Sequence, residues 1–259
     1  MSDVDREVES YLRAAIVAEF PQHGILGEEG EDRGPAGAEF WWVLDPLDGT
    51  TNYVNHLPLF GVSVAVLRQG MPQAGAIFLP GEAPLHGGVY HCVRGGGSWL
   101  NEEPLTLVPQ PAAERHLTAL PAHYWWRFRP SREMARRMGE VRSLGSVVCE
   151  LALTARGVFQ YAAFGAPRIW DVAAGALLVA EAGGAVLVRE DGQWHPLAAF
   201  TPPRRQSGPT APLRDWRAPL VAGNAETAPF VARELRGRGW LGTLLWGLWR
   251  LRRRVKGRG

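Results

Sequence analysis

The chain has 259 residues, 46% hydrophobic and 21% charged, which is typical of a globular protein and argues against disorder. The formal net charge is +2, but residues 240–259 hold six Lys or Arg and no acid, so residues 1–239 are net acidic. Cys92 and Cys149 are too few for a disulfide scaffold, which favours reduced, buried thiols in a cytoplasmic protein. No signal peptide is visible, and no apolar run reaches the ~20 residues that a membrane-spanning helix needs.

The first predicted element is an amphipathic helix over residues 4–19, which Pro21 ends. Its apolar face is formed by Val4, Val8, Tyr11, Leu12, Ala15 and Ile16. An acidic, glycine-flanked stretch follows at residues 24–32. For Glu31 and Asp32 the sequence favours an ordinary solvated loop, and Glu28 is considered below.

Residues 40–53 carry the strongest chemical signal. Five apolar residues predict a buried strand that stops at Asp45-Pro46, because proline has no N–H for a strand ladder. Asp48 follows three positions later, and Gly49 completes a tight turn. Two carboxylates and the Leu47 carbonyl are the hard oxygen ligands that Mg²⁺ prefers. The N–H groups and hydroxyls of Thr50 and Thr51 then offer an anion site, although an Asx-turn with a helix cap is the plainer alternative.

Residues 42–53, Trp-Val-Leu-Asp-Pro-Leu-Asp-Gly-Thr-Thr-Asn-Tyr, resemble the first signature of the inositol monophosphatase family. The resemblance implies a Mg²⁺-dependent, lithium-sensitive phosphomonoesterase. It also implies the layered α/β/α/β/α sandwich of the inositol monophosphatase and fructose-1,6-bisphosphatase type, an α/β (α+β) fold. Members of the family begin with a further helix before the equivalent of Asp5, so the resemblance predicts that this chain lacks the first family helix.

The remaining elements are predicted by alternation, turn residues and helical periodicity. Strands are expected at 60–67, 74–79, 85–93, 97–100 and 141–144, and helices at 131–138 and 146–156. Gly95-Gly96-Gly97 indicates a hairpin turn and not a phosphate loop, because no lysine or helix start follows it. The proline-rich stretch 110–130 predicts a seam between two halves of one domain, residues 1–239.

Two further stretches resemble the family's metal-site elements. Ile25 to Glu29 is similar to the element whose first glutamate, here Glu28, holds metal and helps to activate water. Residues 169–184 predict a helix that Gly183 ends, and Asp171 in its first turn is by itself no more than a capping residue. The stretch is nevertheless similar to the family's second signature, whose aspartate completes the metal site.

The resemblance therefore implies a complete hydrolytic site. The metal ligands, for two or three Mg²⁺, are Glu28, Asp45, Asp48, Asp171 and the Leu47 carbonyl. The catalytic residues are Glu28, Asp45 and Thr50, with the Thr50 hydroxyl hydrogen-bonded near Glu28 and Asp45 to orient water. The substrate and its phosphate are bound by Asp48, Gly49, Thr50, Thr51 and Asp171, and Gly145-Ser146 are placed to meet a substrate hydroxyl.

Phe164 departs from the family pattern. Inositol-specific members carry a glutamate seven positions before the aspartate of the second signature, and phenylalanine cannot accept a hydrogen bond. Inositol 1-phosphate or a related polyol phosphate is the expected substrate. Bisphosphorylated nucleotides, on a 3′(2′),5′-bisphosphate nucleotidase model, and histidinol phosphate are the alternatives.

The apolar and basic stretch 240–259 lies outside the family pattern. It suits an interfacial helix at an anionic membrane, or equally a helix docked on the face that a missing N-terminal helix exposes. The expected partners are thus a small phosphomonoester, a second copy of the chain and weak contact with a membrane. A non-enzymatic rival is an inactive member that binds membrane or nucleic acid through this stretch, and the complete ligand set argues against it.

Overall fold

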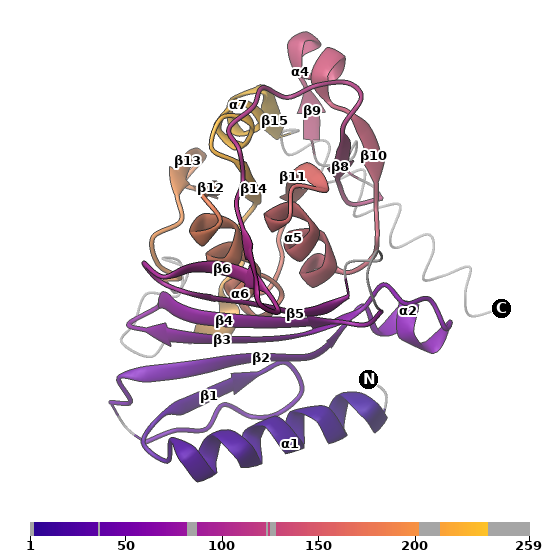
Figure 1. Ribbon diagram of the computed structural model, residues 1–259. Coiled ribbons are helices and arrows are strands. Elements are labelled where there is room, and N and C mark those ends of the chain that lie inside the picture. Colours follow the sequence, from indigo (N-terminus) through magenta and orange to yellow (C-terminus); the bar gives the residue numbers. More distant parts are fainter. Residues whose placement is uncertain are drawn as a thin grey trace, which may run out of the picture.

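The computed structural model describes residues 3–35, 37–81, 87–122, 124, 128–201 and 213–237. Two β-sheets alternate with helices in five layers, and Figure 1 shows helix α1 beneath the first sheet and helices α5 and α6 above it. Helix α7, with α4 against it, covers the far side of the second sheet. The predicted α/β/α/β/α sandwich is confirmed. The basic stretch 240–259, on which sequence predictions were made, lies outside the described residues.

The first sheet has seven strands in sequence order. β1 is parallel to β2, and every later pair is antiparallel. The strands are β1 (Gly24–Gly27), β2 (Phe40–Asp48), β3 (Gly61–Arg68), β4 (Met71–Leu79), β5 (Gly88–Val93), β6 (Gly97–Leu100) and β7 (Glu103–Leu105). The short helix α2 (Thr50–Val54) connects β2 and β3. The turn at Gly95 to Gly97 joins β5 and β6 as a hairpin, as its sequence predicts.

The second sheet has six strands in the order β10-β8-β11-β14-β12-β13. β8 is parallel to its neighbours β10 and β11, whereas the other pairs are antiparallel. The strands are β8 (Leu117–Ala119), β10 (Glu140–Arg142), β11 (Phe159–Phe164), β12 (Gly184–Glu190), β13 (Gln193–Pro196) and β14 (Leu220–Asn224). The accompanying helices are α4 (Arg132–Arg137), α5 (Val147–Ala155), α6 (Ile169–Glu181) and α7 (Thr227–Glu234). The remaining elements are a short ribbon of β9 (Phe128–Pro130) with β15 (Leu235–Gly237), and a 3₁₀ turn, η2 (Leu213–Asp215).

Helix α6 lies between the two sheets and contacts both of them as well as α5. Small residues at the contacts allow α6 to pack closely in this position between the sheets. A Cβ on Gly75 of β4 would lie 3.0 Å from the Ala174 backbone, and one on Gly175 would lie 2.6 Å from the Leu151 Cβ. Larger side chains at these points would force the layers apart. The helix thereby brings its N-terminus, with Asp171, to the end of the first sheet that carries the candidate ligands.

Helix α1 (Asp3–Glu19) agrees with the predicted helix over 4–19, but its buried face was predicted incorrectly. Tyr11 is 75% exposed, whereas Asp5 and Glu9 are only 2% and 3% exposed. Ile16 and the half-buried Leu12 lie on the same side of the helix as these acids. The periodicity of the apolar residues therefore placed Leu12 and Ile16 correctly, but it included the exposed Tyr11 and omitted the two buried acids.

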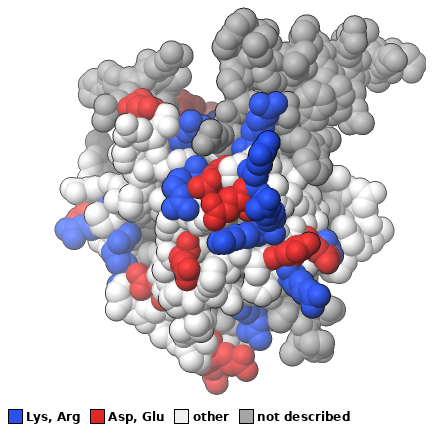
Figure 2. Space-filling view, turned by 90° about the horizontal axis from the view of Figure 1, so that it is seen from above, with Lys and Arg blue, Asp and Glu red and all other residues white. Residues whose placement is uncertain are grey.

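None of the described helices has the length and apolar character needed to cross a membrane. Figure 2 shows the face at the top of Figure 1, near α4 and α7, where acidic and basic side chains lie interspersed. In the described part of this face, basic side chains border a central group of acidic ones.

Candidate metal centre

Parallel pairing of β1 with β2 brings Glu28 beside Asp45. Gly27 is in register with Leu44, and the Glu28 N–H donates to the Leu44 carbonyl at 3.2 Å. Each acid follows directly on this pair, which places the Glu28 carboxyl group close enough to Asp45 for the two to affect one another's pKa. Asp45 is 1% exposed, and its Oδ1 also accepts the Leu47 N–H at 3.2 Å. The sequence prediction that Glu28 and Asp45 share one site agrees with this placement.

The predicted end of β2 at Asp45-Pro46 is wrong. The strand continues through Pro46 to Asp48, and its pairing with β3 shifts register between Asp45 and Asp48. Proline is tolerated here because a bulged segment does not need every ladder hydrogen bond. The shift lets Asp45 and Asp48 both reach the site although they are three positions apart.

Asp48 ties this end of the first sheet to helix α5. Its Oδ2 accepts the Ser146 hydroxyl at 2.6 Å and the Val148 N–H at 2.7 Å. The Ser146 Oγ in turn accepts the Cys149 N–H and caps the helix. Ser146 therefore anchors Asp48 and α5, which differs from the substrate contact expected from the sequence. One oxygen of Asp48 is therefore held by the start of α5.

Asp171 is the third residue of α6 and not its N-cap, which is Arg168. Its Oδ2 accepts the Arg168 N–H at 2.7 Å, so the carboxylate closes the first turn of the helix. Gly183, with φ 89°, follows the helix end as predicted. Capping occupies one carboxylate oxygen, which makes the capping and ligand interpretations of Asp171 compatible.

The four carboxylates perturb one another's ionisation. Burial raises the pKa of Asp45 well above its usual range, and the charges of the other three acids add to the effect. Burial also raises the pKa of Asp171 to about 7, with further contributions from Asp48 and Glu28. The pKa of Glu28 rises to about 7, first through desolvation, although its side chain as a whole is exposed.

These residues fit a cation by their chemistry. Among the described residues no ion pair involves any of the four carboxylates, so their mutual repulsion lacks a salt-bridge partner. In the described part of the chain, no group of three Asp, Glu, His or Cys side chains is arranged so that it could hold a metal ion. The carboxylates are thus near enough to affect one another's pKa values, although no three of them form a ready ligand group in the described chain. Hard oxygen donors of this kind suit Mg²⁺.

The turn after β2 begins at Gly49, whose φ is 86°. Burial raises the pKa of the Asp48 carboxylate, and neighbouring N–H groups, that of Gly49 among them, act to lower it. The N–H groups of Thr50 and Thr51 lie in the first turn of α2, where no intrahelical acceptor is in reach. Asn52 fixes this turn by donating to the Leu59 and Leu144 carbonyls at 2.6 and 2.7 Å.

The Thr50 hydroxyl has different partners from those predicted. Its Oγ lies 3.0 Å from the Leu47 carbonyl and 3.4 Å from Oδ1 of Asp5, which accept its proton, and no hydrogen bond to Glu28 or Asp45 is found. Asp5 was missed at the sequence level. The sequence could have indicated Asp5 because it lies on the same face of α1 as Leu12 and Ile16. Acids are rarely buried, so an acid at a core position suggests a functional role.

Phe164 belongs to the main core cluster and is 4% exposed. The aromatic ring therefore offers little surface to a substrate. The difference from the family pattern that still matters at this position is the absence of a carboxylate.

A model of the inositol monophosphatase family matches residues 1–225. The chain belongs to this family. An inositol-1-monophosphatase of Rhizobium meliloti is 37% identical over 71% of this chain and 70% of its own length. The Nus factor SuhB of Xylella fastidiosa is 32% identical over 88% of this chain and 78% of its own. The solved inositol monophosphatase of Anabaena is 28% identical, with a TM-score of 0.67 over 89% of this chain and 84% of that one.

Membership of the inositol monophosphatase family gives the carboxylate cluster its chemical context. The family consists of Mg²⁺-dependent phosphatases, and the matched region contains every acid of the cluster. The relatives also include a protein named as a Nus factor, so the family name alone does not specify what this member does.

Proposed function

We propose that this protein is an active Mg²⁺-dependent phosphomonoesterase, with inositol 1-phosphate or a related polyol phosphate as its substrate. The observation that carries the proposal is the set of four buried or neighbouring carboxylates that form no ion pair within the described part of the chain, brought to one place by β1, β2 and α6. Glu28, Asp45, Asp48, Asp171 and the Leu47 carbonyl would hold the metal. A structural ion-pair network would instead have supplied arginine or lysine to these acids.

The chain's own residues divide the work around this cluster. The Thr50 hydroxyl donates its hydrogen bond to Asp5 or to the Leu47 carbonyl, so the lone pairs of its oxygen can accept a hydrogen bond from the attacking water and orient it. The N–H groups of Thr50 and Thr51 are oriented to bind phosphoryl oxygens. When bound, Mg²⁺ supplies positive charge that makes water easier to deprotonate and offsets the charge of the phosphoryl group.

We expect weak discrimination among polyol phosphates. A carboxylate that accepts a substrate hydroxyl is worth about ten- to hundred-fold in kcat/KM, and the chain has Phe164 in its place. Inositol 1-phosphate should therefore be hydrolysed with little preference over glycerol 2-phosphate. The measurement is released phosphate across a panel of sugar, polyol, nucleotide and histidinol phosphates at saturating Mg²⁺, with EDTA as control. No release from any of them would refute the proposal, and a preference for inositol 1-phosphate of about a thousand-fold would place selectivity elsewhere.

Protons should compete with Mg²⁺ at this site. Because the folded-state pKa values of Glu28 and Asp171 are raised to about 7, the folded state binds more protons than the unfolded state from about pH 4 to 7. The stability due to these groups is greatest below that range and is lost as the pH rises through about 7. Added Mg²⁺ should therefore raise the Tm more at about pH 8 than at about pH 6. Differential scanning fluorimetry in EDTA and in Mg²⁺ checks this, and an equal shift at both pH values would contradict it.

A further inference from the structure

The loop that follows β1 is held from the α1 side by a buried glutamate. Glu9 accepts the N–H groups of Glu29 at 3.0 Å and Gly30 at 2.9 Å, and it is paired with Arg13 at 2.7 Å. The approach is close: a Cβ on Gly27 would clash with the Glu9 carboxylate. A cavity of about 570 Å³ lies between α1, β1 and this loop. Because the cavity leaves space beside the loop, the hydrogen bonds to Glu9 are needed to restrain it on this side.

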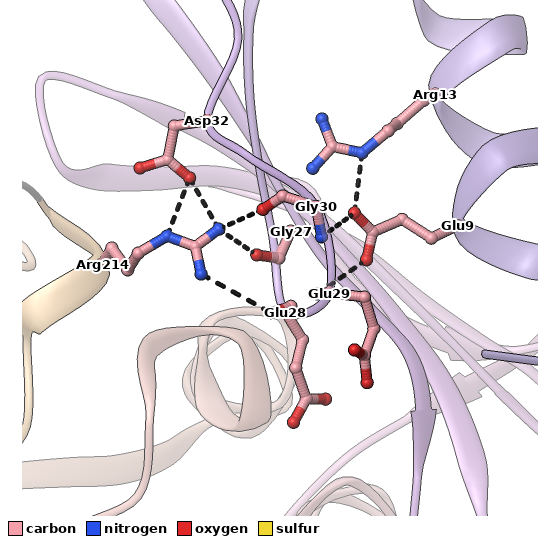
Figure 3. A network of polar contacts seen from close by, with 8 residues as sticks. All are labelled: Glu9, Arg13, Gly27, Glu28, Glu29, Gly30, Asp32 and Arg214. Carbon is pink, nitrogen blue, oxygen red and sulfur yellow. Dashed lines mark hydrogen bonds and ion pairs between the residues drawn. The ribbon is translucent and has the colours of Figure 1, made fainter. Parts of the chain in front are cut away.

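Arg214 of η2 binds the same loop from the side opposite to Glu9 (Figure 3). Its Nη2 donates to the Gly27 carbonyl at 2.6 Å and to the Gly30 carbonyl at 2.5 Å. Its Nε and Nη2 also bind Oδ1 of Asp32 at 3.0 and 2.9 Å, and Nη1 lies 3.5 Å from the Glu28 carbonyl. Figure 3 shows the Glu28 side chain pointing away from both Glu9 and Arg214, so its backbone is held while its carboxylate is directed elsewhere.

The same guanidinium also contacts the second carboxylate-bearing element. The Arg214 Cζ lies 5.5 Å from the centre of the Trp170 ring, a cation–π distance, and Trp170 is 5% exposed. Trp170 directly precedes Asp171 in the first turn of α6. The Arg214 side chain therefore contacts both the loop that carries Glu28 and the helix that carries Asp171, two segments that lie far apart in the sequence.

We propose that Arg214, opposed across the loop by Glu9, is a positioning residue that sets the place of Glu28 relative to Asp171 and thereby the affinity of the site for Mg²⁺. This inference rests on the proposed function, since it concerns the same metal site. Arg214 makes no hydrogen bond or ion pair to the four carboxylates of the metal site; it acts through the loop of residues 27–32 and through Trp170. The planar guanidinium is required because it donates to several carbonyls and stacks on an indole at once, which an ammonium does not do.

Arg214→Ala should weaken Mg²⁺ binding by about tenfold or more, the usual effect of removing a group that orients metal ligands. Calorimetric titration of Mg²⁺ measures the dissociation constant without turnover. In metal-free protein, hydrogen exchange at the amides of Glu29 and Gly30 should become faster, because the loop loses its carbonyl contacts. In activity assays the Mg²⁺ concentration for half-maximal rate should rise, while the rate at saturating Mg²⁺ recovers to near that of wild type.

Three comparison variants separate positioning from general destabilisation. Arg142→Ala removes another arginine that pairs with an acid, Glu140, and donates to a carbonyl, but on β10. It should leave Mg²⁺ binding unchanged. Asp32→Asn keeps the carbonyl contacts of Arg214 and should stay close to wild type, whereas Arg214→Lys keeps the charge without the fork and should be intermediate.

A wild-type Mg²⁺ affinity and unchanged exchange in Arg214→Ala would overturn the inference while leaving the proposed function intact. If Arg214→Ala does not fold, Arg214→Lys decides by the same two measurements. If wild-type protein neither binds Mg²⁺ nor releases phosphate, the proposed function itself fails. Loss of active protein without a shift in the Mg²⁺ midpoint would show that Arg214 only stabilises the fold, and would also overturn the inference.

Discussion

Asp45→Asn should abolish Mg²⁺-dependent phosphate release, lowering kcat/KM by about 10³-fold or more. Asp45 is the most buried acid of the cluster, and every other carboxylate there raises its pKa. An amide keeps the acceptor for the Leu47 N–H but has no charge to bind Mg²⁺, so the loss falls on the metal-dependent term, which is worth several kcal/mol. Released phosphate from the best substrate of the panel, over a full Mg²⁺ titration, gives the answer.

The control for Asp45→Asn is the stability of the metal-free variant. Removing one of several buried like charges relieves repulsion, so the Tm in EDTA should be no lower than that of wild type, and Mg²⁺ should no longer raise it. A variant that has lost activity because it is misfolded would instead melt earlier under both conditions. Near wild-type turnover with wild-type Mg²⁺ dependence would show that Asp45 is not a ligand.

The parts of the site that the sequence could predict are those encoded within a short stretch. Asp45, Asp48 and the turn at Gly49 lie within a few residues of one another, so strand, turn and carboxylates could be recognised together. Asp171 alone indicated only a helix cap, and the family resemblance was needed to add a ligand role. The structure shows why both interpretations could arise, since one oxygen of Asp171 caps the helix.

The parts that could not be predicted depend on contacts across the chain. Arg214 reaches Gly27 over a separation of 187 residues, and nothing beside it in the sequence indicates a partner. Pro46 was misjudged because the rule that proline ends a strand holds for a regular ladder and not for a shifted one. Asp5 was omitted because an amphipathic pattern assigns charged residues to the solvent, and a buried acid is the exception that function creates.

Thr50→Ala and Asp5→Asn should each lower kcat by roughly 10²-fold with little change in Mg²⁺ affinity. Thr50 and Asp5 form one hydrogen-bonded pair, in which Asp5 orients the hydroxyl and the hydroxyl oxygen accepts a hydrogen bond from the attacking water. Once either member is removed, the other has lost its function, and the double variant should be little slower than the slower single variant. Single-turnover rates and Mg²⁺ titrations of the four proteins in this cycle provide the measurement.

The size of the coupling between Thr50 and Asp5 distinguishes two structural roles. If the two effects multiplied to about 10⁴-fold, the residues would act independently, and the 3.4 Å contact would have no part in the reaction. If Thr50→Ala shifted only the Mg²⁺ midpoint, the hydroxyl would serve the Leu47 carbonyl, 3.0 Å away, by fixing a ligand. The two partners of this hydroxyl are distinct in space, so the kinetic cycle reports which of them it serves during turnover. Asp5 lies on the same buried face of α1 as Glu9, so we expect this helix to align the water-activating pair and the Glu28 loop together.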